Sequence, residues 1–132
     1  MSRTRRIVGT VVGVLFVLSA LAHSLLGGKA MRTDLVAAQV PADLLQGALV
    51  GWHFGGVAML AFGCIVLLTF VRRRNADGAA LLPARIIAAT YLAFGGGAFF
   101  YTKFEPFFLV FLVPGMLLAF AAFSPRRATA GE

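Results

Sequence analysis

The chain has 132 residues, of which 60% are hydrophobic and 13% are charged, and its formal net charge is +7. A water-soluble domain of this length has too little interior to cover so much apolar surface. The composition therefore argues against an ordinary soluble domain and predicts an integral membrane protein, with the lipid bilayer as its first partner.

Four apolar segments are long enough to cross the hydrocarbon layer, which takes about 20 residues per helix. Helices satisfy their own backbone hydrogen bonds in lipid. We therefore predict an all-α fold with one domain over residues 1–132, a four-transmembrane-helix bundle. The predicted spans are residues 7–28, 44–71, 82–102 and 106–123, with a loop over residues 29–43 between the first two.

The charged residues divide unequally between the two sides of such a bundle. On the side of the termini, the basic residues Arg3, Arg5, Arg6, Arg72, Arg73, Arg74, Arg85, Arg126 and Arg127 stand against Asp77 and Glu132. On the other side Lys29, Arg32 and Lys103 are balanced by Asp34, Asp43 and Glu105. By the positive-inside rule both termini are cytoplasmic. The basic charge is thus explained by orientation, and we expect no nucleic-acid partner.

The first segment also resembles a cleavable secretory signal, with Ala20 and Ala22 as the small residues of a cleavage site. The apolar run continues to Gly28, however, which is long enough to span. We therefore expect this segment to remain as a membrane helix. The bias toward Ala, Gly and Val favours a bacterial plasma membrane.

The chain has two histidines, and both are predicted in the outer half of the bilayer. His23 lies near the end of the first span, and His53 lies in the sequence GWHFGG of the second. An ionisable residue inside a membrane is a candidate functional residue, and imidazole binds transition metals and haem and carries protons. The predicted ligand site comprises His23, His53, Ser24, Trp52, Tyr101 and Glu105, with His23 and His53 as the metal ligands.

Simpler roles are open for the same residues. Each histidine could only bond across helices, Trp52 and Tyr101 could be interfacial aromatic residues, and Glu105 could begin the fourth helix before Pro106. Two histidines are also fewer than the three or four ligands that zinc sites use. Small residues predict close helix packing, namely Gly47, Gly51 and Gly55 in the second span and Gly9 and Gly13 in the first.

Two short motifs resemble a family of small four-span bacterial membrane proteins. In that family a His-Ser-x-Leu-Gly-Glu stretch ends the first helix and a Trp-His pair opens the second. The matching residues here are HSLLG at 23–27 and WH at 52–53, while Gly28 stands where the family has Glu. The resemblance implies that the two histidines act as a pair, and the glycine removes a carboxylate expected beside His23.

Three functions follow from these patterns. The first is a binding or redox-accessory role, in which the histidines hold a transition metal, haem or a quinone head group. The second is a structural or assembly subunit that docks a second copy or another membrane protein. The third, a proton-coupled carrier, is disfavoured because the spans contain no carboxylate. No nucleophile with its base, phosphate loop or dinucleotide motif is present, which favours a non-catalytic role and leaves catalysis open.

Overall fold

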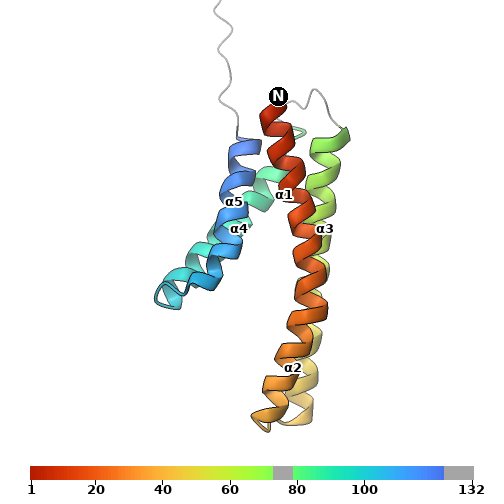
Figure 1. The fold of residues 1–132 in the computed structure, drawn as a ribbon, viewed down its shortest axis with the longest axis vertical. Coiled ribbons are helices and arrows are strands. Elements are labelled where there is room, and N and C mark those ends of the chain that lie inside the picture. The colour runs from red at the N-terminus through yellow and green to blue at the C-terminus, as the bar shows by residue number, and fades with distance from the viewer. Residues whose placement is uncertain (73–78, 124–132) are drawn as a thin grey trace, which may run out of the picture. The chain divides into compact units, whose positions relative to one another are not determined.

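The structure is a computed structural model that describes residues 1–72 and 79–123. Within these ranges every regular element is helical, so the predicted all-α class is confirmed (Figure 1). The elements are α1 (Arg3–Ala22), the π-helix η1 (His23–Gly27), α2 (Gly28–Ala37), α3 (Ala42–Arg72), α4 (Leu82–Tyr101), the 3₁₀-helix η2 (Pro106–Phe108) and α5 (Leu109–Ala122).

Three helical stretches are long and apolar enough to cross a membrane, judged by length and composition. They are Arg3–Ala37, Ala42–Arg72 and Leu82–Tyr101, and the apolar stretch Pro106–Ala122 is shorter. Large apolar side chains also cover much of their outer surface, including Leu25 at 69% exposure and Leu26 at 71%. Such a surface is stable against lipid tails and costly in water.

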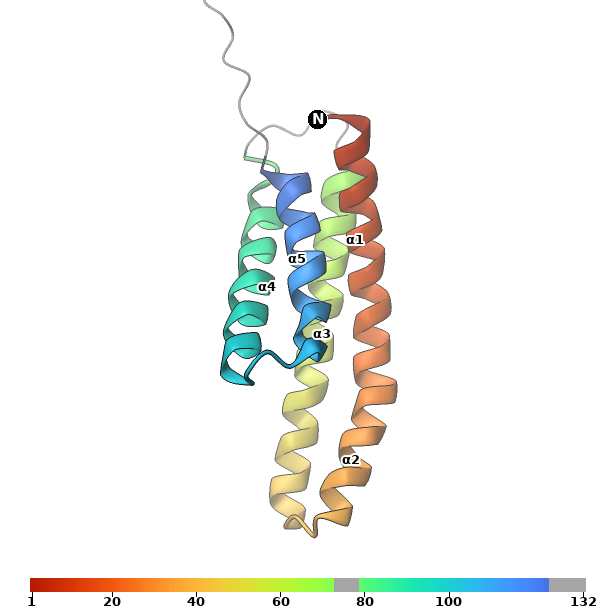
Figure 2. The ribbon, with the colours of Figure 1, turned by 60° about the vertical axis from the view of Figure 1, so that its left-hand side comes forward.

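The predicted loop over residues 29–43 is wrong. Helix α2 continues α1 and η1 without a break to Ala37, and α3 begins at Ala42, so only residues 38–41 connect the two. Gln39 takes a positive φ of 55°, and the Val40 N–H donates to the Leu35 carbonyl to close the turn. Charge suggested a loop, but Lys, Ala, Met, Arg and Leu are all good helix formers. Figures 1 and 2 both show α2 running beside the start of α3.

The helical stretches Arg3–Ala37 and Ala42–Arg72 are both longer than the hydrocarbon layer of a membrane is thick. The 35 residues of Arg3–Ala37 extend about 52 Å at 1.5 Å per residue, whereas the layer is about 30 Å thick. Tilts of up to about 40° would leave roughly 40 Å along the membrane normal. In a membrane, part of the stretch would lie outside the hydrocarbon, and Lys29, Arg32 and Asp34 are the charged residues near its C-terminal end.

The chain forms two compact units, each described here by itself. One contains residues Gly13–Ile65, which we call the hairpin, and the other contains Met1–Val12 with Val66–Glu132. In the hairpin, a Cβ added at Gly63 would lie 2.8 Å from Val17 Cγ2 and 3.2 Å from the Gly13 carbonyl oxygen. Glycine at position 63 therefore lets the two helices approach closely, as in small-residue packing of membrane helices.

In the other unit, α4 and α5 pack through a glycine from each helix. A Cβ added at Gly95 would lie 2.9 Å from Phe111 Cβ, and one added at Gly115 would lie 3.1 Å from Tyr91 Cβ. Gly9 of α1 meets the Phe70 ring, whose atoms would be 2.5 Å from an added Cβ. Glycine thus sets the helix separation at each of these contacts.

Two arginines cap the C-terminal end of α5. Arg5 Nη2 donates to the Phe123 carbonyl at 2.7 Å, and Arg85 Nε donates to the Ala122 carbonyl at 3.1 Å. Their guanidinium groups also lie over the Phe120 and Phe123 rings, each 5.4 Å from the ring centroid. The last carbonyls of a helix have no partner within it, and a cation there also complements the helix dipole.

Two of the basic residues predicted on the cytoplasmic side, Arg5 and Arg85, therefore contribute to folding. Of the other charged residues predicted on that side, Arg73, Arg74, Arg126, Arg127, Asp77 and Glu132 lie outside the described residues. The cytoplasmic position of both termini stays a prediction.

Replacing Arg85 by Gln should lower the free energy of unfolding by about 1–2 kcal/mol, because a charge-assisted hydrogen bond and a cation–π contact are lost. Arg5→Gln should give a smaller loss, because the hydrogen bond of Arg5 is exposed whereas that of Arg85 is partly buried. SDS titration in mixed micelles, followed by circular dichroism, measures both. Arg3→Gln is the control, since Arg3 makes no side-chain hydrogen bond to the described residues. Equal stability of the Arg3 and Arg85 variants would contradict the capping role.

Candidate functional site

At the motif HSLLG the first helical stretch departs from α-helical geometry, because a backbone hydrogen bond there spans five residues instead of four. Over His23–Gly27 it forms a π-helix, and the Gly28 N–H donates to the His23 carbonyl five residues earlier. Single π turns within α-helices are rare and occur frequently at functional sites. This turn changes the direction in which the residues after His23 face.

His23 and Trp52 hold the two helices together by a reciprocal contact. Their rings are stacked, with centroids 4.2 Å apart and planes inclined by 6°. Trp52 Nε1–H donates to the His23 carbonyl at 2.8 Å, and His23 Nε2 lies 3.1 Å from the Trp52 carbonyl. Because a carbonyl can only accept, Nε2 of His23 carries the hydrogen. We call this arrangement the His–Trp brace.

Gly27 provides the space that the Trp52 ring occupies, whereas Gly55 makes an ordinary contact with His23. A Cβ added at Gly27 would lie 2.8 Å from Trp52 Cζ2, and one added at Gly55 would lie 3.4 Å from His23 Nε2. At Gly56 an added Cβ would collide with Ser24 Oγ. The close packing here thus joins a ring or hydroxyl to a backbone, rather than two backbones.

Of the three glycines predicted to pack in the second span, the first two, Gly47 and Gly51, face open space. A Cβ at Gly47 or Gly51 would meet no atom of the hairpin within 4 Å. Their role in packing stays a prediction, and any partner for them would have to come from outside the hairpin.

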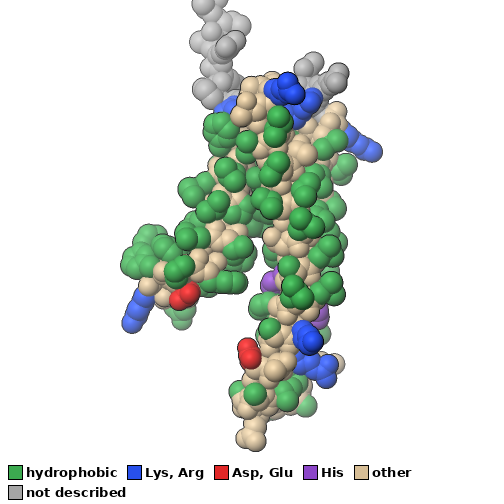
Figure 3. All heavy atoms as spheres, in the orientation of Figure 1, with side chains coloured by type: hydrophobic (Ala, Val, Ile, Leu, Met, Phe, Trp, Pro, Cys, Tyr) green, Lys and Arg blue, Asp and Glu red, His purple; other side chains and the backbone are tan. Residues whose placement is uncertain are grey.

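His53 faces a different surface from His23. Its side chain is exposed, and its Cε1 atom would lie 3.1 Å from a Cβ added at Gly28. The motif position that departs from the resembled family therefore lies beside His53. Figure 3 shows histidine surface at separate places along the hairpin, above its charged tip.

A shallow groove of about 440 Å³ runs past His53. Its polar lining comes from His53, Arg32 and Gln46, and its apolar lining comes from Ala42, Leu45, Leu49 and Val50. On α3, positions 42, 46, 49 and 53 follow the three- and four-residue spacing of one helix face. We call this the His53 groove.

Both histidines lie a short way inside the charged tip. His23 precedes Lys29 by six residues, about 9 Å along a helix, and His53 follows Asp43 by ten, about 15 Å. Their position in the outer half of a bilayer stays a prediction.

The predicted site residues divide between the two units. His23, Ser24, Trp52 and His53 belong to the hairpin, while Tyr101 and Glu105 belong to the other unit. Tyr101 ends α4 at 90% exposure, and Glu105 precedes Pro106 at the start of η2. Membership of these two in a ligand site stays a prediction.

Arg32 and Gln46 line the His53 groove but were not among the site residues predicted from the sequence. Gln46 could have been found, since it lies seven residues before His53 and therefore on the same helix face. Arg32 could not, because residues 29–43 were assigned to a loop.

The donor set fits a metal ion poorly. Among residues 1–72 and 79–123, no three His, Cys, Asp or Glu side chains are grouped where they could hold one ion. His23 also uses its Nε2 in the brace, so ligation there would break a hydrogen bond and the stack.

No protein-family model, curated protein or solved structure matches this chain. The resemblance seen in the sequence thus stays a prediction. Of the motif residues, Trp52 lies against both His23 and Gly27.

Trp52→Phe and His23→Phe each keep an aromatic ring but remove one N–H donor. Each should lower the free energy of unfolding by about 1 kcal/mol. The loss in their double variant should differ from the sum of the single losses, because the two rings are stacked on each other and substitutions at residues in contact are coupled. SDS titration followed by circular dichroism measures the three values.

The exposed neighbour Phe54, at 74% exposure, supplies the control Phe54→Leu, which should leave stability unchanged. Single variants as stable as this control would contradict the brace.

Proposed function

We propose that this chain is a multi-pass protein of the bacterial plasma membrane, with both termini cytoplasmic, that binds a quinone-type head group in the His53 groove at the outer leaflet. His53 would be the main ligand-binding residue, and His23 would hold the groove in place through the brace. The role is one of binding or redox support, not catalysis.

The observation that carries this proposal is the mixed lining of the groove. His53, Arg32 and Gln46 can all donate hydrogen bonds to the carbonyl oxygens of a quinone. Leu45, Leu49 and Val50 offer an apolar surface for its isoprenoid tail. Small-molecule sites commonly combine a few orienting polar groups with a largely apolar wall.

Among the three ligand types predicted from the sequence, a quinone makes the fewest demands on this donor set. A metal ion usually needs three or four protein ligands, and a haem bound through Nε2 of His23 would take the nitrogen that the brace already uses. A quinone needs only hydrogen bonds and apolar contact.

Trp52 provides a built-in reporter, because it is the only tryptophan of the chain. Its Cδ1 atom lies 3.6 Å from a Cβ added at Gly28, the same position that His53 approaches. Decylubiquinone added to the protein in detergent should quench Trp52 fluorescence. His53→Ala or Arg32→Gln should raise the dissociation constant about tenfold, which corresponds to a loss of roughly 1.4 kcal/mol of binding free energy.

Lys29→Gln is the matched control, since it removes the same charge from the same helix without lining the groove. It should bind like the wild type. Equal dissociation constants for all variants would show quenching by quinone dissolved in the micelle and would overturn the proposal. A Soret band, or near-stoichiometric metal that His23→Ala/His53→Ala removes, would instead establish the haem or metal function.

The second candidate function is that of a structural or assembly subunit. The open space around Gly47 and Gly51 favours it, since two glycines four residues apart on an exposed helix face allow close approach of another helix.

Gly51→Leu tests this second function. Because nothing in the hairpin lies within 4 Å of the added Cβ, the variant should fold normally, and it should lose association if this face docks a partner helix. Size-exclusion chromatography with light scattering in detergent gives the protein mass. Gly96→Leu is the control, as position 96 is also open in the other unit. Unchanged mass in the Gly51 variant would contradict docking at this face.

A further inference from the structure

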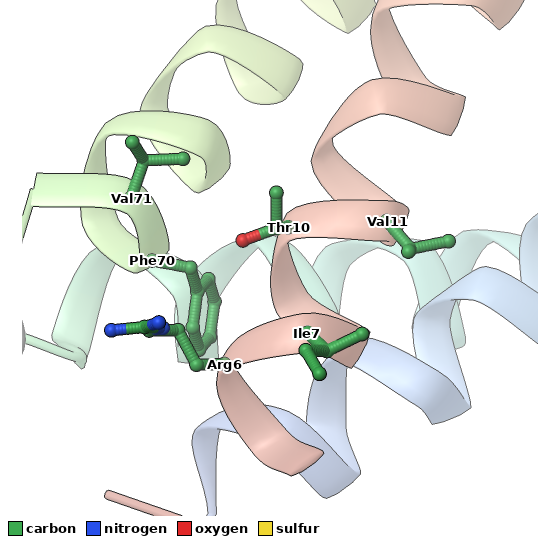
Figure 4. Close-up of a pocket in the computed structure, with 6 residues that line it drawn as sticks. All are labelled: Arg6, Ile7, Thr10, Val11, Phe70 and Val71. Carbon is green, nitrogen blue, oxygen red and sulfur yellow. The ribbon is translucent and has the colours of Figure 1, made fainter. Parts of the chain in front are cut away.

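A second groove, in the other unit, is lined by the first turns of α1 and the end of α3 (Figure 4). It has a volume of about 410 Å³ and is lined by Arg6, Ile7, Thr10, Val11, Phe70 and Val71. Glycine at position 9 leaves room for the Phe70 ring that lines the groove, because a side chain at this position would collide with the ring. We call it the Arg6 groove.

Two polar groups in this groove have no partner among the described residues. Thr33, Thr90 and Thr102 each donate to the carbonyl four residues earlier, the usual solution for threonine in a helix. The Thr10 hydroxyl makes no such bond, and in Figure 4 it points toward α3. The Arg6 guanidinium likewise has no hydrogen bond or ion pair within the ranges that the structure describes, unlike Arg5 and Arg85.

Arg6 and Thr10 are four residues apart, so both project from one face of α1. A guanidinium and a hydroxyl on one face match the oxygen atoms of a phosphate group, which arginine binds with strong charge-assisted hydrogen bonds. The groove therefore has the donors for a phosphate and holds none of its own acidic side chains.

The rest of the lining favours a lipid as the source of that phosphate. Ile7, Val11 and Val71 are 51%, 50% and 59% exposed, so they present an apolar surface beside the two donors. A soluble anion would gain nothing from these side chains, whereas an acyl chain would cover them. Arg6 also lies where the apolar part of α1 begins, the level at which basic residues meet anionic head groups.

We propose that the Arg6 groove binds one anionic phospholipid, with its phosphate on Arg6 and Thr10 and an acyl chain along Ile7, Val11 and Val71. This site is independent of the His53 groove. It would give the protein a specific lipid at its basic end in addition to the general attraction of its arginines.

Native mass spectrometry of the detergent-purified protein, titrated with phosphatidylglycerol or phosphatidylcholine, tests the proposal. The wild type should retain phosphatidylglycerol in preference. Arg6→Gln and Thr10→Val should each weaken that binding about fivefold, as expected for one basic residue near the head groups or one hydrogen bond. Thr10→Ser keeps the hydroxyl and should bind like the wild type.

Arg3→Gln removes an equal charge from the same end of α1 without lining the groove, and it should have no effect. Equal weakening by Arg3→Gln and Arg6→Gln would indicate diffuse attraction and overturn the site. Displacement of the lipid by inorganic phosphate would overturn the lipid assignment in favour of a free anion. Equal retention of the two lipids would overturn both.

Discussion

The hairpin depends on two aromatic rings that stack on each other while each donates a hydrogen bond to the other's backbone. Stacking of this kind contributes about 0.5–1.5 kcal/mol beyond area burial, and the two hydrogen bonds fix the rotation of both rings. The π turn at His23–Gly27 belongs to the same arrangement, because it leaves the His23 carbonyl to accept from both Gly28 N–H and Trp52 Nε1–H. A side chain at position 27 would leave no space for the Trp52 ring between the helices.

This arrangement separates the two histidines by role. His23 is half-buried and bonded, so its titratable ring acts as a packing group, whereas His53 is exposed on a face with Arg32 and Gln46. The adjacent residues Trp52 and His53 project about 100° apart around α3, so one segment holds the two helices together and leaves the His53 side chain exposed. The two histidines of the apolar spans therefore differ in their surroundings, since one packs between helices and the other is exposed.

Hydropathy predicted the helical class and most helix positions, because lipid requires helices and tolerates few charges. It failed at residues 29–37, where charge suggested a loop although the residues themselves form helix well. The sequence motifs predicted a pairing of His23 with His53, and the stack of His23 on Trp52 was not predicted. Its geometry depends on a π turn, which rotates all later residues of the stretch and cannot be read from a wheel at 100° per residue. The roles of Gly27, Gly55 and Gly56 were also hidden, since spacing alone does not tell whether a glycine faces a backbone, a ring or open space.

The separation of the two imidazoles can be tested most directly by nuclear magnetic resonance of the protein labelled with ¹⁵N-histidine. Decylubiquinone and Zn²⁺ would be added to separate samples in detergent. The account predicts that one imidazole, His53, responds to decylubiquinone, while the other keeps a slowly exchanging proton on Nε2 with both additives. Loss of that proton with simultaneous shifts of both imidazoles on addition of Zn²⁺ would contradict it, because the two histidines would then share one metal ion.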